Sequence, residues 1–70
     1  MSREGKVLDL IMMTVAYPID VLMEVGSDKE KRAEAAKLMQ AIRTRAEKRY
    51  WLDDEAIDLG SDLYKLIWEG

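Results

Sequence analysis

Residues 11–26, IMMTVAYPIDVLMEVG, decide the fold of this 70-residue chain, because they combine a long apolar run with the only proline. Helical spacing continues on both sides of the run and no hairpin turn interrupts it, which favours a helix over a buried strand. Pro18 removes its own backbone N–H and clashes with the carbonyl four residues earlier. The pattern predicts a first helix over about residues 3–25, kinked or broken at Pro18, with a kink as the preferred interpretation.

A second helix is indicated just after this run. Gly26 suits the positive φ that often follows the last residue of a helix. The stretch SDKE at 27–30 then has the pattern of a capping box, with Ser27 as the cap and Glu30 three residues later. These signals predict a second helix over about residues 28–50.

A third helix is predicted over about residues 54–69. Asp53 can cap it, and the acidic residues that follow favour the positive end of a helix. Gly60 lies in its middle, where glycine costs about 1 kcal/mol relative to alanine. Because Ala56 lies one turn earlier, the two small residues predict that another helix packs closely here. The sequence therefore predicts one all-α domain, a three-helix up-down array.

Composition limits both the stability and the chemistry of the chain. A domain of about 60 residues buries only ~60 % of the surface that its unfolded chain exposes. The sequence has no cysteine and no histidine, so disulfides and the commonest transition-metal ligand are missing. It also lacks a glycine-rich phosphate loop and a calcium-binding loop. We expect no cofactor, no metal and no enzymatic activity.

The first helix is apolar around nearly its whole circumference, apart from one narrow charged stripe. Such a helix must be buried nearly all round, and two further helices of a short chain cannot easily cover it. We therefore predict a helical homodimer, the commonest symmetric assembly. Alternatively, the later helices cover the spare face and the methionines fill gaps. The predicted dimer or partner interface consists of Val7, Leu8, Ile11, Met12, Val15, Ile19, Leu22 and Met23.

Charge is segregated along the chain, although the net charge is only −3. Residues 28–50 carry eight basic and four acidic side chains, whereas residues 51–70 carry six acidic side chains and one basic one. The two helices can complement each other at the surface, where each pair contributes little. Alternatively, an acidic row formed by Asp54, Asp58 and Asp62 binds a basic partner.

A nucleic-acid interface on the second helix is a further alternative, because arginines and lysines there could follow phosphates. A calculated isoelectric point of about 4.8 argues against it. The residues of this alternative are Lys37, Arg43, Arg45, Lys48 and Arg49.

The leading functional hypothesis is a small regulatory or adaptor protein that homodimerises and binds a protein partner. Binding of DNA or RNA is the second hypothesis, and an engineered helical scaffold or binder is a third, because residues 28–49 are rich in strong helix formers. The first residues lack the features of a secretory signal, and Asp20 and Glu24 interrupt an apolar run too short to span a bilayer. We therefore expect a cytoplasmic protein that does not insert into membranes. Trp68 or Trp51 would be a candidate partner anchor if it proved exposed.

Overall fold

The computed structural model describes residues 3–48 and 53–69 of the chain, and every regular element in these ranges is helical. This confirms the all-α class. The elements are α1 Arg3–Ala16, α2 Pro18–Val25, α3 Lys29–Glu47, α4 Asp54–Tyr64 and a short π-helical segment, η1 Lys65–Glu69, that continues α4. Arg49, Trp51 and the predicted end of the second helix at residue 50 lie outside the described residues.

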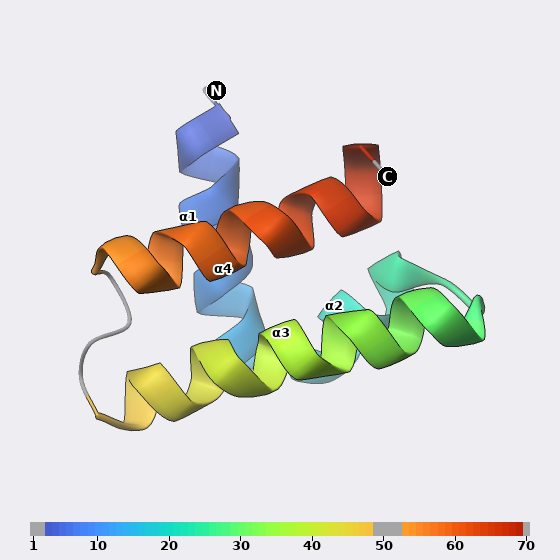
Figure 1. The fold of residues 1–70 in the computed structure, drawn as a ribbon, viewed down its shortest axis with the longest axis horizontal. Coiled ribbons are helices and arrows are strands. Elements are labelled where there is room, and N and C mark those ends of the chain that lie inside the picture. Colours follow the sequence, from blue (N-terminus) through green and yellow to red (C-terminus); the bar gives the residue numbers. More distant parts are fainter. Residues whose placement is uncertain (1–2, 49–52, 70) are drawn as a thin grey trace.

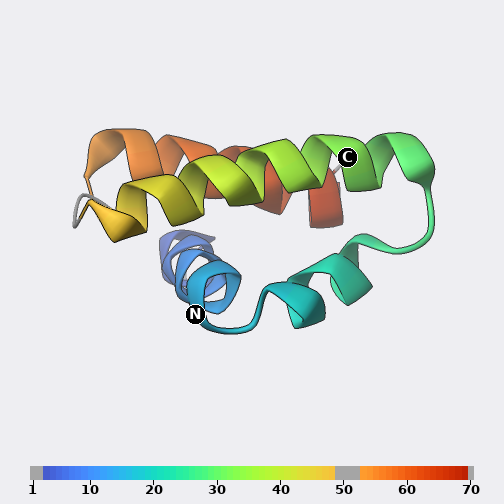
Figure 2. The same ribbon diagram turned by 90° about the horizontal axis from the view of Figure 1, so that it is seen from below.

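The helices form two layers. α3 and α4 lie side by side in one layer, and α1 and α2 lie in the other (Figures 1 and 2). α2, α3 and α4 alternate in direction, whereas α1 crosses behind α4 at a steep angle. The outer sides of α1 and α2 therefore face away from the α3–α4 layer on the same side of the molecule.

The first predicted helix is broken at Pro18 rather than kinked, which corrects the preferred interpretation. The amide of Tyr17 donates to the carbonyl of Met13 over 2.6 Å, and Tyr17 then leaves the helical conformation with φ −136° and ψ 62°. Pro18 begins α2, where its missing N–H would have no helical partner in any case. The hydroxyl of Thr14 donates to the carbonyl of Leu10 over 2.8 Å, so it does not satisfy the backbone at the break.

The cap of α3 differs by one residue from the prediction. Asp28, not Ser27, is the cap residue, and its Oδ1 accepts hydrogen bonds from the amides of Glu30 at 2.9 Å and Lys31 at 3.1 Å. A carboxylate satisfies the free amides as a hydroxyl would and adds a negative charge at the positive helix end. Gly26 does have the predicted positive φ, at 94°.

The core lies between the two layers and is built around a close contact of α1 with α4. Gly60 is buried, and a Cβ at this position would stand 2.6 Å from Cγ1 of Ile11 and 3.1 Å from Cγ1 of Val7. The prediction of close helix packing at Ala56 and Gly60 is therefore confirmed. The buried apolar residues are Val7, Leu10, Ile11, Val21, Val25, Ala35, Met39, Ile42, Ala56 and Leu63.

Candidate functional site

The residues of the predicted interface separate into two groups in the folded chain. Val7 and Ile11 are only 3 % and 0 % exposed, because Gly60 lets α1 approach α4 closely enough to bury them. They are therefore removed from the candidate interface, and Leu22 is half-buried beside α3. The remaining five are exposed and are called the outer face: Met12, Ile19 and Met23, with Leu8 at the edge next to α4 and Val15 at the edge next to α3.

The centre of the outer face is formed by one residue of α1 and two residues of α2. Met12 is 52 % exposed, Ile19 72 % and Met23 73 %. On both helices these positions lie opposite the buried residues, so they point away from the α3–α4 layer shown in Figure 2. Single exposed apolar residues are ordinary, but a group of them on one face marks an interaction site.

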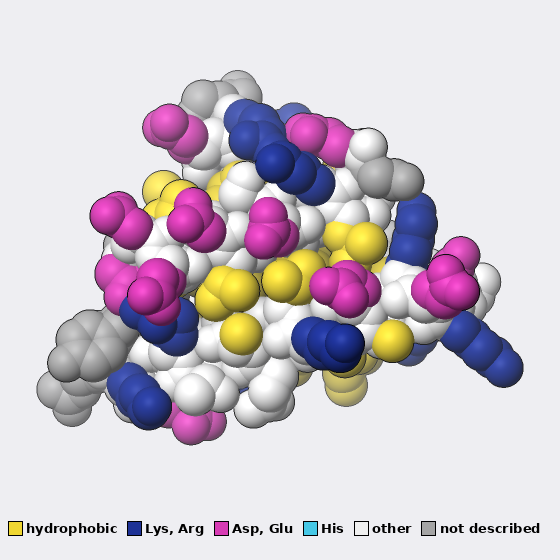
Figure 3. Space-filling model, in the orientation of Figure 1, with side chains coloured by type: hydrophobic (Ala, Val, Ile, Leu, Met, Phe, Trp, Pro, Cys, Tyr) yellow, Lys and Arg dark blue, Asp and Glu magenta, His cyan; other side chains and the backbone are white. Residues whose placement is uncertain are grey.

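The opposite side of the molecule carries the acidic row. Asp54, Asp58 and Asp62 are all exposed on α4, and Figure 3 shows several carboxylates along this helix, beside apolar side chains that lie between α3 and α4. None of the three takes part in an ion pair within the described residues. An open groove next to the row has an apolar floor that includes Ala41 and Leu59.

Arg45 of α3 binds the start of α4 rather than the acidic row. Its guanidinium donates to both carboxylate oxygens of Asp53, at 3.2 Å from Nε and at a shorter distance from Nη2, and Nη1 lies 2.5 Å from Oε2 of Glu55. Asp53 also accepts the amide of Ala56 at 2.9 Å, which confirms it as the cap of α4. The hydrogen bonds from Arg45 and from this amide lower the pKa of Asp53, and the bond to Asp53 raises the pKa of Arg45.

This ion pair bears on the nucleic-acid alternative. Because Arg45 is held by two carboxylates, a phosphate would have to displace them. Lys37 and Arg43 are exposed on α3, and Lys48 is exposed directly after its last residue. Arg49 lies outside the described residues. The sequence alone could not show that Arg45 is already paired with acidic residues of the same chain.

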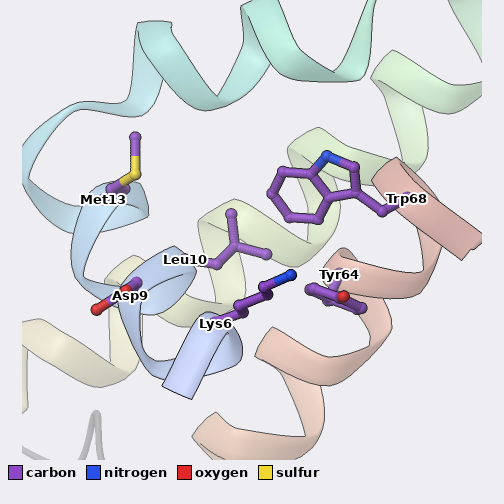
Figure 4. Close-up of a pocket in the computed structure, with 6 residues that line it drawn as sticks. All are labelled: Lys6, Asp9, Leu10, Met13, Tyr64 and Trp68. Atoms are coloured by element: carbon purple, nitrogen blue, oxygen red, sulfur yellow. The ribbon is translucent and has the colours of Figure 1, made fainter. Parts of the chain in front are cut away.

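A cleft between α1 and the C-terminal segment was not predicted from the sequence. It has a volume of about 510 Å³ and is lined by Lys6, Asp9, Leu10, Met13, Tyr64 and Trp68 (Figure 4). Trp68 is 52 % exposed, and its ring lies 5.1 Å from that of Tyr64. The only sequence signal that could have indicated this cleft is the pair of aromatic residues Tyr64 and Trp68, four positions apart. The rest of the cleft depends on the packing of α1 beside η1, which the sequence pattern does not show.

Comparisons with protein-family models, with curated proteins and with solved structures found no match. Across residues 3–48 and 53–69, no helix combines the length and the apolar character needed to cross a membrane. The same residues contain no group of three or more acidic side chains placed to hold a metal ion. The part of the folded chain that the structure describes thus offers three candidate sites: the outer face, the acidic row with its groove, and the cleft.

Proposed function

We propose that this chain is a non-enzymatic regulatory or adaptor protein that forms a homodimer through the outer face. The observation that carries the proposal is the exposure of Met12, Ile19 and Met23 on one side of the α1–α2 layer. Burying them against a second copy enlarges the small core of a chain that has no disulfide. Methionine side chains adapt readily to such a contact.

The size of the molecule is compatible with this assembly. A standard interface covers about 800 Å² on each partner, which is about one sixth of the 4888 Å² of accessible surface of the chain. The exposed acidic residues Asp20 and Glu24 lie beside Ile19 and Met23 on α2, where they can form a solvated rim. An apolar centre with a polar rim is the usual anatomy of a protein interface.

The protein partner is proposed to bind on the opposite layer. The groove between α3 and α4 offers an apolar floor, with Glu55 on its α4 side and Lys37 on its α3 side, and the acidic row lies next to it on α4. This combination fits a basic amphipathic helix, which would place apolar residues on Leu59 and lysine or arginine residues near Asp58 and Asp62. The dimer would then present two such sites.

The mass in solution at low micromolar concentration tests the dimer. The wild-type chain is expected at twice the mass of one chain, and the Ile19→Glu/Met23→Glu variant at the mass of one. Ala36→Glu/Gln40→Glu is the matched control, because it adds the same two charges at the same spacing to exposed positions on α3. A folded wild-type monomer, or a dimer that survives the first pair of substitutions, contradicts the proposal.

A second experiment tests the partner site independently of the dimer. A lysine-rich amphipathic helical peptide serves as the probe, and its binding is measured by titration at low salt. The Asp54→Asn/Asp58→Asn/Asp62→Asn variant is expected to bind the peptide several-fold more weakly and to remain a dimer. The Glu4→Gln/Asp9→Asn/Glu34→Gln variant removes three exposed carboxylates that lie outside the proposed dimer interface and the groove, and it controls for net charge. Equal loss in both variants would indicate unspecific attraction.

A further inference from the structure

The cleft beside the C-terminal segment has the composition of a small-molecule site. Leu10 and Met13 of α1 form one apolar wall, and Trp68 projects into the space from η1 (Figure 4). The volume of about 510 Å³ falls within the range of roughly 300–1,000 Å³ that is typical of ligand pockets. Its lining is mostly apolar with few polar groups, as such pockets usually are.

Lys6 supplies the single cation of the cleft. Its side chain extends toward Tyr64, whereas the side chain of Asp9, which also lines the cleft, points away from Lys6 (Figure 4). Lys6 takes part in none of the ion pairs formed among the described residues. Because Lys6 is exposed, its attraction for an anion is modest, and the apolar walls contribute the rest of the binding free energy.

Contacts between the two ends of the chain hold the wall that carries Trp68. Nε of Arg3 lies 3.1 Å from Oε2 of Glu69, and the Arg3 guanidinium stands 5.2 Å from the centre of the Tyr64 ring. These contacts join the first turn of α1 to the last residue of α4 and to the last residue of η1. Segments of π-helix are uncommon and often occur at functional sites, so the geometry that directs Trp68 into the cleft is itself notable.

We infer that the cleft binds an amphipathic monocarboxylate, with its carboxylate on Lys6 and its hydrocarbon chain against Leu10, Met13 and Trp68. A single positive charge matches a single carboxylate. A phosphate or a polyanion would bring more negative charge than Lys6 alone balances, beside the carboxylate of Asp9 that also lines the cleft. This inference does not depend on the homodimer or on the proposed partner site.

Fluorescence of Trp68 tests the inference directly. In a Trp51→Phe background, Trp68 is the only tryptophan, so its emission reports on the cleft alone. Sodium decanoate is added below the concentration at which it forms micelles, and a saturable change in emission is expected. Decanol, which has the same chain without the charge, is expected to bind more weakly.

Two variants separate binding in the cleft from general adsorption. Lys6→Gln keeps the length of the side chain nearly unchanged and is expected to weaken decanoate binding by about fivefold, the upper end for an exposed charge pair. Lys37→Gln removes an exposed lysine from α3 and should leave binding unchanged. The inference is overturned if binding is not saturable, if decanol binds as tightly as decanoate, or if the two lysine variants behave alike.

Discussion

Gly60 of α4 lies directly against Ile11 of α1. A Cβ at position 60 would stand 2.6 Å from Cγ1 and 2.7 Å from Cδ1 of Ile11. This contact explains why α1 crosses α4 at this point. It also explains why Ile11 is completely buried while Met12, the next residue, is half exposed. The orientation of α1 about its own axis, and with it the exposure of Met12, follows from this contact.

Gly60→Ala is expected to destabilise the protein despite the better helix propensity of alanine. Overpacking against a buried isoleucine costs about 1–3 kcal/mol, which exceeds the gain of at most about 1 kcal/mol from replacing glycine in a helix. Urea unfolding measures the difference. Ser61→Ala, at the next position of α4, should stay within about 0.5 kcal/mol of the wild type.

Ile11→Val is the compensating change for this test, because it shortens the side chain that meets position 60. Neighbouring substitutions couple, so the Gly60→Ala/Ile11→Val double variant should be more stable than the sum of the single effects predicts. Additive effects, or a Gly60→Ala variant more stable than the wild type, would mean that α1 can move away from α4 without loss.

Asp28→Ala is expected to lower the free energy of unfolding by about 1 kcal/mol, the usual cost of losing a helix cap. Ser27→Ala should have almost no effect, since Asp28 rather than Ser27 accepts the amides at the start of α3. Thermal or urea unfolding of the two variants compares the adjacent positions under the same conditions. A larger loss of stability in Ser27→Ala than in Asp28→Ala would show that Ser27 caps the helix, as the sequence pattern predicts.

The ion pair of Asp53 with Arg45 should make stability depend on pH in the acidic range. The folded protein holds the pKa of Asp53 below its ordinary value, so the pair stabilises the fold above the unfolded-state pKa of about 4. That contribution is lost as the pH falls through the lower pKa of the folded state, because the unfolded chain then takes up the proton first. Acidification should therefore destabilise the wild type.

Asp53→Asn isolates this charge, because asparagine is also a good helix cap. The variant should be less stable than the wild type at pH 7, and the difference should shrink as the pH falls below about 4. Asp58→Asn removes an exposed carboxylate outside the ion pair and controls for the loss of one negative charge. A difference between Asp53→Asn and wild type that stays constant down to pH 2 would speak against the ion pair.

The thermal midpoint should depend on protein concentration if the chain is a homodimer. Association stabilises the folded state by mass action, so dilution should lower the midpoint of the wild type. The Ile19→Glu/Met23→Glu variant should show one midpoint at all concentrations. Circular dichroism over a hundredfold dilution series distinguishes the two cases, and a wild-type midpoint that never moves would exclude a folding-coupled dimer.

The protein is expected not to bind nucleic acid through α3. A labelled duplex is not expected to shift with the wild type at low salt, because the chain is acidic overall and Arg45 is bound to Asp53 and Glu55. The Lys37→Glu/Arg43→Glu variant is the comparison, because it reverses two exposed charges of α3 and leaves the ion pair of Arg45 intact. A shift that weakens steeply with salt and disappears in this variant would favour the second functional hypothesis.

Much of the local structure was predictable from particular residues. Pro18 indicated an interruption, Gly26 a change of chain direction, and Asp53 the start of the last helix, and each acts through its own backbone geometry or hydrogen bonds. Ser27 and Asp28 show the limit of this reasoning. Both can cap a helix, and only the backbone angles of the folded chain select between them.

The candidate sites were predictable only in part. The acidic row follows from four-residue spacing on one helix, which needs no knowledge of the fold. The ion pair of Arg45 and the cleft beside Trp68 are formed by helices that meet only when the chain packs. The periodicity of a single helix therefore cannot predict either of them.

The sequence by itself determined that the chain forms helices, where most of them begin and end, and that its first segment carries more apolar surface than one packing face requires. These properties follow from local rules of backbone geometry, capping and periodicity. Only the tertiary structure decided which of those apolar residues enter the core. α1 is apolar on several sides, so its helical periodicity alone does not show which side faces the core. The contact of Ile11 with Gly60 selects that side and leaves Met12 outside, and the burial of Val21 and Val25 does the same for α2 and leaves Ile19 and Met23 outside.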